Sequence, residues 1–128
     1  MSDDLPEGWA RTTLANGLLE GVQPGFACGQ TNREGEGVPH LRPMNVSQDG
    51  RIALSDLKFI PTSEVDREER WVRSGDVLFN NTNSPELVGK TAYYGESNPR
   101  SFSNHMTRLR CRQDVLDPQF CAAFLHHQ

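Results

Sequence analysis

A run of five small polar residues, Asn80, Asn81, Thr82, Asn83 and Ser84, directly follows a short apolar strand predicted over residues 77–79. Amide and hydroxyl side chains both donate and accept hydrogen bonds, so they can pair with base edges or phosphates. Pro85 interrupts the polar run, and a second strand is predicted over residues 88–92. This pattern is typical of a polar rim that contacts nucleic acid. The alternative is an Asn-rich hairpin loop that satisfies its own backbone.

Cations and further amide or imidazole side chains add to this pattern. The segment 100–112 contains four arginines and no acid, and it also contains Asn104 and His105. Asn104 and His105 offer donors and acceptors to bases, sugars or phosphates. Phosphate contacts are predicted for Arg42, Lys90, Arg100 and Arg108. The alternative for the arginines is that their stems cover a sheet while their heads meet solvent.

Five segments of the chain, in order, resemble the target recognition domain of the DNA specificity subunit of Type I restriction-modification systems. The central segment reads GDVLFNNTNS and is followed by ELVGKTA, at residues 75–84 and 86–92. The others are LPEGW at 5–9, PHLRPMNV at 39–46, FSNHMTRLR at 102–110 and DPQF at 117–120. Each segment is unspecific alone, but their order matches the family and spans nearly the whole chain.

The resemblance implies DNA target recognition within a complex whose other subunits methylate and cleave. The implied partners are double-stranded DNA and the methyltransferase and restriction subunits. The polar run is expected to position the DNA backbone, while loops 29–37 and 94–104 select bases. The resemblance also implies one recognition domain, residues 1–128, that stops before a long spacer helix. The alternative is a fragment that pairs with methyltransferase subunits, or with itself through residues 117–128, without tight DNA binding.

Catalytic motifs are absent from the sequence. There is no glycine-rich phosphate loop, and the cofactor and catalytic motifs of the family's methyltransferases do not appear. Asp76, Glu86 and Lys90 are close in sequence, but Asp76 fits turn chemistry before a strand better than a nuclease site. His126, His127 and Cys121 do not supply a zinc ligand set. We therefore expect no enzyme activity, no cofactor and no metal in this chain.

Composition indicates one domain in a reducing compartment. The chain has 128 residues, a formal net charge of −4, eleven glycines and eight prolines, which favours short elements and many turns. Its three cysteines, Cys28, Cys111 and Cys121, are widely spaced, which predicts free thiols. No apolar run is long enough to cross a membrane, and the acidic start is unlike a signal peptide. The expected location is the cytoplasm.

The element pattern predicts a mixed α/β (α+β) fold with a small, irregular, mainly antiparallel sheet and a few short helices. Strands are predicted over residues 22–28, 38–41, 77–80, 88–93 and 107–112, and the short apolar segments 52–54 and 57–60 are assigned to the core. Along 107–112, Thr107, Leu109 and Cys111 face one way and three arginines face the other. Helices are predicted over 14–20 and 64–70 and from Asp117 onward. The predicted core residues are Trp9, Phe59, Trp71, Phe79 and Leu109.

Overall fold

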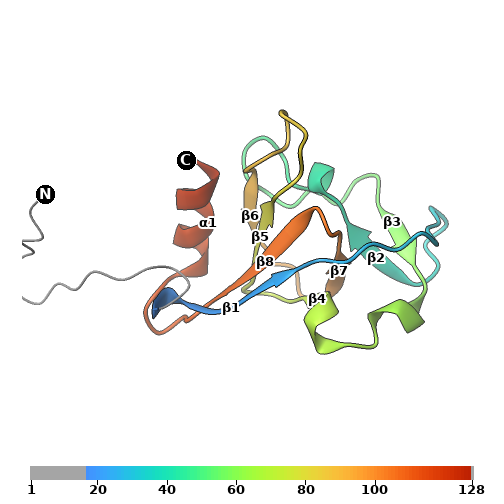
Figure 1. Cartoon of the computed structure of the whole chain (residues 1–128), viewed down its shortest axis with the longest axis horizontal. Helices are drawn as coiled ribbons and strands as arrows, with labels where there is room; N and C mark the ends of the chain where they lie inside the picture. Colours follow the sequence, from blue (N-terminus) through green and yellow to red (C-terminus); the bar gives the residue numbers. More distant parts are fainter. Residues whose placement is uncertain (1–16, 128) are drawn as a thin grey trace, which may run out of the picture.

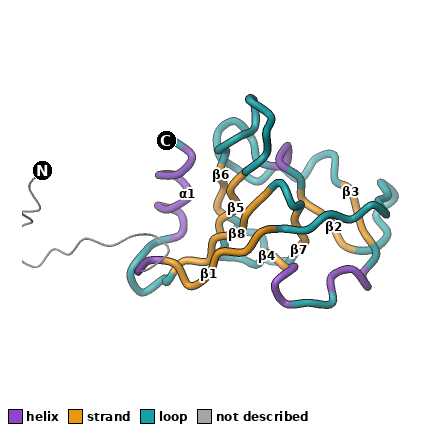
Figure 2. Tube along the Cα trace, in the orientation of Figure 1, coloured by secondary structure: helices purple, strands orange, loops and turns teal. Residues whose placement is uncertain are grey.

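A computed structural model describes residues 17–127, which form an α+β fold in three layers (Figure 1). A C-terminal helix covers one face of a first sheet, and a second sheet covers the other face. Short strands joined by long connections dominate the tube view (Figure 2). The abundance of Gly and Pro accounts for the short strands, because both residues weaken strand interiors and favour turns.

The first sheet contains four antiparallel strands in the order β1-β8-β5-β6. Their bounds are Leu19–Pro24 (β1), Met106–Cys111 (β8), Val77–Asn80 (β5) and Thr91–Tyr93 (β6). The prediction that segments 77–80, 88–93 and 107–112 share one sheet is confirmed. Strand β6 begins later than predicted because residues 85–89 form turns.

The second sheet also has four strands, in the order β3-β2-β7-β4. Their bounds are Lys58–Ile60 (β3), Val38–Leu41 (β2), Arg100–Phe102 (β7) and Trp71–Val72 (β4). Strands β2 and β7 pair in parallel, whereas the other pairs are antiparallel. The sequence predicted one sheet. The structure has two. The second sheet was not predicted because its central strands, β2 and β7, are far apart along the chain and no local pattern indicates that they pair.

The main core lies between the two sheets. It contains Leu41, Val72 and Phe102 from the second sheet and Leu78 and Met106 from the first. Val46, Ala92 and Tyr94 also belong to it. Among the predicted core residues, Leu109 is buried, whereas Phe59, Trp71 and Phe79 are only half-buried; Trp9 lies outside the described residues. The fully buried core residues were not predicted, because their burial depends on how the two sheets pack against each other.

Helix α1 (Pro118–His126) packs on the outer face of the first sheet (Figure 1). Its Cys121 and Ala122 join Val77, Leu109 and Cys111 in a second apolar cluster. Asp117 caps the helix by accepting a hydrogen bond from Gln119 N (2.8 Å), and Pro118 occupies the first turn. The predicted start of this helix is confirmed.

Other local predictions were wrong in part. The helix predicted over 14–20 falls partly outside the described residues, and its residues 19 and 20 belong to strand β1. The helix predicted over 64–70 is instead two 3₁₀ turns, η3 (Thr62–Val65) and η4 (Glu68–Arg70). A further 3₁₀ turn, η2 (Pro43–Asn45), follows β2. The segment 52–54 packs Ile52 and Leu54 against the main core, as predicted, and forms an isolated bridge between Ile52 and Val46. Within residues 17–127, no helix has the length and apolar character to cross a membrane.

Candidate nucleic-acid interface

The alternating pattern of strand β5 continues into the polar run and separates its first two asparagines. Asn80 is fully buried, whereas Asn81 is exposed. The Nδ2 atom of Asn80 donates to the carbonyl oxygens of Pro43 (2.9 Å) and Leu87 (3.2 Å). Asn80 therefore connects η2 with the polar loop, residues 80–90, and both N–H groups of its side chain are already used. The two-residue period of a strand explains this division.

Asn81 joins the polar run to the turn that precedes strand β8. Its N–H donates to the carbonyl oxygen of His105 (3.0 Å), and its Nδ2 donates to that of Asn104 (3.3 Å). Its Oδ1 accepts a hydrogen bond from Thr107 Oγ1 (2.9 Å). Residues 81–84 and 103–105 therefore form one continuous surface, which we name the polar edge. The sequence predicted both halves but not their contact.

Besides Asn81, three predicted site residues are exposed on the polar edge: Asn83, Asn104 and His105. Thr82 and Ser84 are half-buried. Ser84 Oγ donates to a carboxylate oxygen of Glu86 (2.8 Å), and this hydrogen bond lowers the pKa of Glu86. The carbonyl oxygen of Ser84 also accepts from the N–H groups of Leu87 and Val88. Ser84 therefore shapes the loop, and the accessible amide and imidazole groups come from the other three residues.

The chain segment after strand β1 supports the turn at 103–105. Gly25 N donates to Met106 O (3.0 Å), and Phe26 N donates to Phe102 O (3.2 Å). A Cβ atom at Gly25 would lie 2.0 Å from the carbonyl oxygen of Ser103. Only glycine permits this approach. Backbone hydrogen bonds from Gly25 and Phe26 therefore hold this part of the polar edge in place, and the sequence motifs gave no indication of them.

The structure buries Arg108, one of the predicted phosphate contacts. Its residue exposure is 7%, and Nη1 donates to the carbonyl oxygens of Trp71 (2.5 Å) and Glu69 (3.3 Å). Burial, followed by the nearby charge of Arg110, lowers the pKa of Arg108. The sequence left two interpretations open for the arginines of β8, a phosphate contact or a stem that covers a sheet with its head in solvent. Arg108 does neither: it contacts the second sheet and is not placed for phosphate contact, whereas Arg110 pairs with Asp76.

Lys90 and Arg100 lie in sequence between the two segments of the polar edge but differ in their surroundings. The Arg100 side chain is only 13% exposed, and its Nη1 donates to the hydroxyl oxygen of Tyr94 (2.6 Å). The Tyr94 hydroxyl in turn donates to Asn98 O (2.6 Å), and burial raises the pKa of Tyr94. Arg100 therefore orders the 94–104 loop. Lys90 is half-buried and ends the loop that begins at Asn80.

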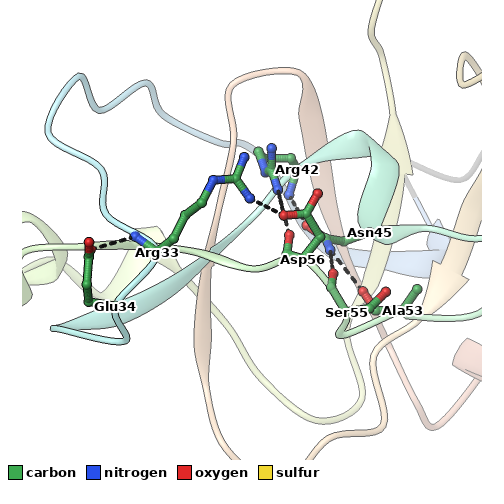
Figure 3. Close-up of polar contacts among 7 residues, drawn as sticks. All are labelled: Arg33, Glu34, Arg42, Asn45, Ala53, Ser55 and Asp56. Atoms are coloured by element: carbon green, nitrogen blue, oxygen red, sulfur yellow. Dashed lines mark hydrogen bonds and ion pairs between the residues drawn. The ribbon is translucent and has the colours of Figure 1, made fainter.

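Arg42 belongs to a cluster that sequence reasoning only partly found (Figure 3). Its Nη2 donates to the backbone oxygen of Asp56 (2.6 Å) and lies 3.8 Å from the Asp56 carboxylate. Arg33 pairs with the same carboxylate. The two missed residues, Arg33 and Asp56, are 23 positions apart in the chain, so no spacing rule connects them.

The loop 29–37 is anchored rather than free along its length. Asn32 and Phe59 exchange two backbone hydrogen bonds, of 3.0 and 2.8 Å, which attach the loop to β3. The side-chain oxygen of Asn32 also accepts from the N–H groups of Glu34 and Glu36. Arg33 and Glu34 at the loop tip are exposed. The loop predicted to select bases thus has a fixed base and an accessible tip.

Surface hollows lie elsewhere, between α1 and strand β6. Two of them, of about 410 and 580 Å³, share Tyr93 and Gln119 in their linings. Neither includes a residue of the polar edge. Within residues 17–127, no group of three His, Cys, Asp or Glu side chains is arranged to hold a metal ion.

Comparison with known proteins supports the resemblance inferred from the sequence. No protein-family profile matches the chain. A curated protein of Methanocaldococcus jannaschii, described as a type I restriction enzyme MjaX specificity subunit, is 28% identical over 127 residues. That match covers 97% of this chain and 29% of the curated protein. The chain thus spans less than a third of this relative.

Solved structures share the fold. One is the HsdS subunit from Thermoanaerobacter tengcongensis, with a TM-score of 0.68 and 22% identity. Another comes from a study of complex assembly and conformational transition in the type I R-M system, with a TM-score of 0.69 and 22% identity. Each covers 97% of this chain and 28% of the other. The predicted resemblance to specificity subunits is therefore confirmed, and so is the α+β fold.

Proposed function

We propose that this chain is a target recognition domain that reads part of a duplex DNA site for a type I restriction-modification complex. The similarity to a specificity subunit and the shared fold support this proposal. The observation that carries it is the polar edge, where two distant segments, 81–84 and 103–105, are joined through Asn81. Exposed asparagine and histidine side chains at this edge suit hydrogen bonds to DNA.

The proposed roles within the edge follow from exposure. Asn83, Asn104 and His105 contact bases, sugars or phosphates because their side chains are accessible. Arg42 and Lys90 contact phosphates from the two sides of the loop. Asn80 and Arg108 hold neighbouring segments in place and do not contact DNA, since both side chains donate hydrogen bonds to backbone carbonyl oxygens inside the protein. Thr82 and Ser84 keep the polar loop in shape.

Base selection is proposed for loops 29–37 and 94–104. The first loop presents its tip to solvent, and the second is ordered by the contact between Arg100 and Tyr94. The formal net charge of −4 means that the chain has no large basic footprint. We therefore propose that the methyltransferase and restriction subunits supply additional DNA affinity, and we assign no catalytic step to this chain. The three free thiols suit the cytoplasm.

A second candidate function, a protein-interaction fragment, is favoured by one surface. Phe120 and Phe124 on α1 are 63% and 53% exposed, and their rings stack with centroids 6.3 Å apart. Exposed apolar patches commonly mark protein contacts. We propose that residues 117–128 mediate a homodimer or the contact with a partner subunit. This role is compatible with DNA recognition and does not require it.

The test of the proposed function is a transfer of specificity. The chain replaces one recognition domain of an intact specificity subunit, and sequencing then identifies the DNA sites that the assembled complex methylates. We expect the half-site assigned to the replaced domain to change. A graft that carries the combined changes Asn83→Ala, Asn104→Ala and His105→Ala should assemble but methylate poorly. An active graft with an unchanged target would exclude target selection and favour the interaction fragment.

A further inference from the structure

We propose that Arg33 and Arg42 form a two-armed site for a backbone phosphate, and that Asp56 occupies this site when no phosphate is bound. The inference rests on the proposed function, because it takes the phosphate to belong to duplex DNA. It adds three points to that function: the ligand group is a phosphate, Arg33 contributes although it lies outside the family-like segments, and Asp56 competes with the phosphate.

Three separate segments bring the cluster together (Figure 3). Arg33 comes from loop 29–37, Arg42 directly follows strand β2, and Asp56 precedes strand β3. Both guanidinium groups approach the Asp56 carboxylate, Arg33 as an ion pair and Arg42 at 3.8 Å. Guanidinium groups bind carboxylates and phosphates through the same geometry. A carboxylate held between two arginines therefore occupies a position that suits a phosphate.

Hydrogen bonds place Arg42 beside both halves of the polar edge. The residue before it, Leu41, accepts a hydrogen bond through its carbonyl oxygen from Ser103 N (2.9 Å). The residue after it, Pro43, accepts one from Asn80 Nδ2 (2.9 Å). Arg42 thus lies between the contacts that anchor segments 103–105 and 80–84. A DNA strand lying on the polar edge would pass close to this arginine.

The exposure of the cluster makes its ion pair exchangeable. The Arg33 and Asp56 side chains are 58% and 45% exposed. Exposed ion pairs contribute little to the free energy of folding, so this one is easily broken. The Arg42 side chain is 20% exposed and is fixed by the backbone oxygen of Asp56. We therefore infer that Arg42 is the fixed arm and that Arg33 is the arm that exchanges carboxylate for phosphate.

The backbone at Asp56 allows a clean substitution. Its φ of +52° is in the left-handed region, where it is the only residue other than glycine among those that the structure describes. Asp and Asn tolerate this region better than most residues. Asp56→Asn therefore removes the charge but keeps the backbone conformation and the carbonyl group that fixes Arg42.

The first measurement is binding to duplex DNA as a function of salt. A duplex of any sequence serves, because phosphate contacts are independent of sequence. Arg33→Ala and Arg42→Ala should each weaken binding and lower the salt slope by about one ion. Asp56→Asn should tighten binding and leave the slope close to the wild-type value, because the competitor is lost while the number of phosphate contacts stays the same. In the double variant with Arg33→Ala, that gain should be largely lost.

The control uses the matched ion pair between Arg73 and Glu68 at the η4 end of the molecule. Its atoms are 2.7 Å apart, and its side chains are 48% and 65% exposed. Arg73→Ala and Glu68→Gln change net charge by the same amounts as the test variants. If Glu68→Gln strengthens binding as much as Asp56→Asn, only net charge matters and the two-armed site is wrong.

The second measurement uses inorganic phosphate and the NMR signals of the arginine Nε–H groups. Phosphate should shift the Arg33 and Arg42 signals more in the Asp56→Asn variant than in the wild type, and should leave the Arg73 signal unchanged. This response without any duplex binding would support an anion site while refuting the DNA function. Duplex binding that is unchanged in the Arg33, Arg42 and Asp56 variants would refute the site while leaving the DNA function in place. No response in either measurement would refute both.

Discussion

Asp76 and Arg110 form a bidentate ion pair that joins the residue before strand β5 to the end of strand β8. Arg110 Nε lies 2.8 Å from Asp76 Oδ1, and Nη2 lies 2.9 Å from Oδ2. The Asp76 side chain is only 3% exposed and also accepts a hydrogen bond from Arg73 N (2.8 Å). The turn role expected for Asp76 is thus confirmed. Its carboxylate is compensated from both sides.

Arg110→Ala is expected to destabilise the protein by about 3 kcal/mol, because it leaves a buried carboxylate without its charged partner. Urea denaturation followed by circular dichroism measures this change. Arg112→Ala is the matched control on the same strand end, since its contact with Asp114 is long (3.7 Å) and exposed. That control should cost about 0.5 kcal/mol or less. Equal losses in the two variants would show that the Asp76 contact does not stabilise the fold.

Stability should fall as pH drops from about 6.5 to about 4 because of His40. Burial is the main reason that its pKa is lowered from 6.5 to about 4, and its Nδ1 lies 2.8 Å from Ser101 Oγ. The unfolded chain binds a proton across this window and the folded chain does not, so the contribution present at pH 7 is lost on acidification. The shift corresponds to about 3 kcal/mol.

His40→Gln removes this titration and keeps a polar side chain. The difference in unfolding free energy between pH 7 and pH 4 should therefore be smaller in the variant than in the wild type, by about the same 3 kcal/mol. Urea denaturation of both proteins at the two pH values gives the comparison. Equal differences would mean that His40 is protonated in the folded state well above pH 4.

The cysteines should react in two classes. All three are free, as predicted; Cys28 is half-buried, whereas Cys111 and Cys121 are buried in the cluster between β8 and α1. Burial, with Cys121 as a neighbour, raises the pKa of Cys111 to about 12. Thiol reagents act on thiolates, so at pH 8 the folded protein should react first at Cys28. Mass spectrometry after unfolding without reductant should find three labels, and a single label would reveal a disulfide.

Asn80 and Asn83 should behave oppositely despite belonging to one motif. Asn80→Ala removes two hydrogen bonds from a fully buried side chain and leaves a cavity, so it is expected to cost about 2 kcal/mol of stability. Asn83→Ala should leave stability within about 0.5 kcal/mol, because the residue is exposed. Thermal unfolding and duplex binding are measured for both. Weaker binding by Asn83→Ala at unchanged stability would match the proposed roles, whereas normal binding would remove Asn83 from the interface.

Self-association should depend on the exposed face of α1. Sedimentation velocity over a range of concentrations is expected to show a dimer, and Phe120→Ser should shift it toward monomer because Phe120 is 63% exposed. Val88→Ser is the matched control, since Val88 is 52% exposed but lies in the polar loop. A wild-type protein that stays monomeric at high concentration would contradict the proposed contact through residues 117–128.

Local sequence determined much of the fold. The apolar run at 77–79 and the alternation along 107–112 predicted strands that do pair, because strand composition and a two-residue period are local properties of the sequence. Asp117 and Pro118 predicted where α1 begins, because a helix start depends on adjacent residues. The polar run from Asn80 to Ser84 was visible for the same reason. Continuing the strand period by two residues would also have separated Asn80 from Asn81.

Tertiary structure decided which of these residues are available. Arg108 was predicted to contact phosphate, but the second sheet covers it, and the parallel pairing of β2 with β7 that builds this sheet joins residues about sixty positions apart. Arg33 and Asp56 lie beside Arg42 although Asp56 is 23 and 14 positions from the two arginines, so their contact was also not apparent in the sequence. Short-range patterns report the conformation of a segment. The burial of a side chain and the formation of ion pairs depend on which segments pack together, and this packing is determined only when the whole chain folds.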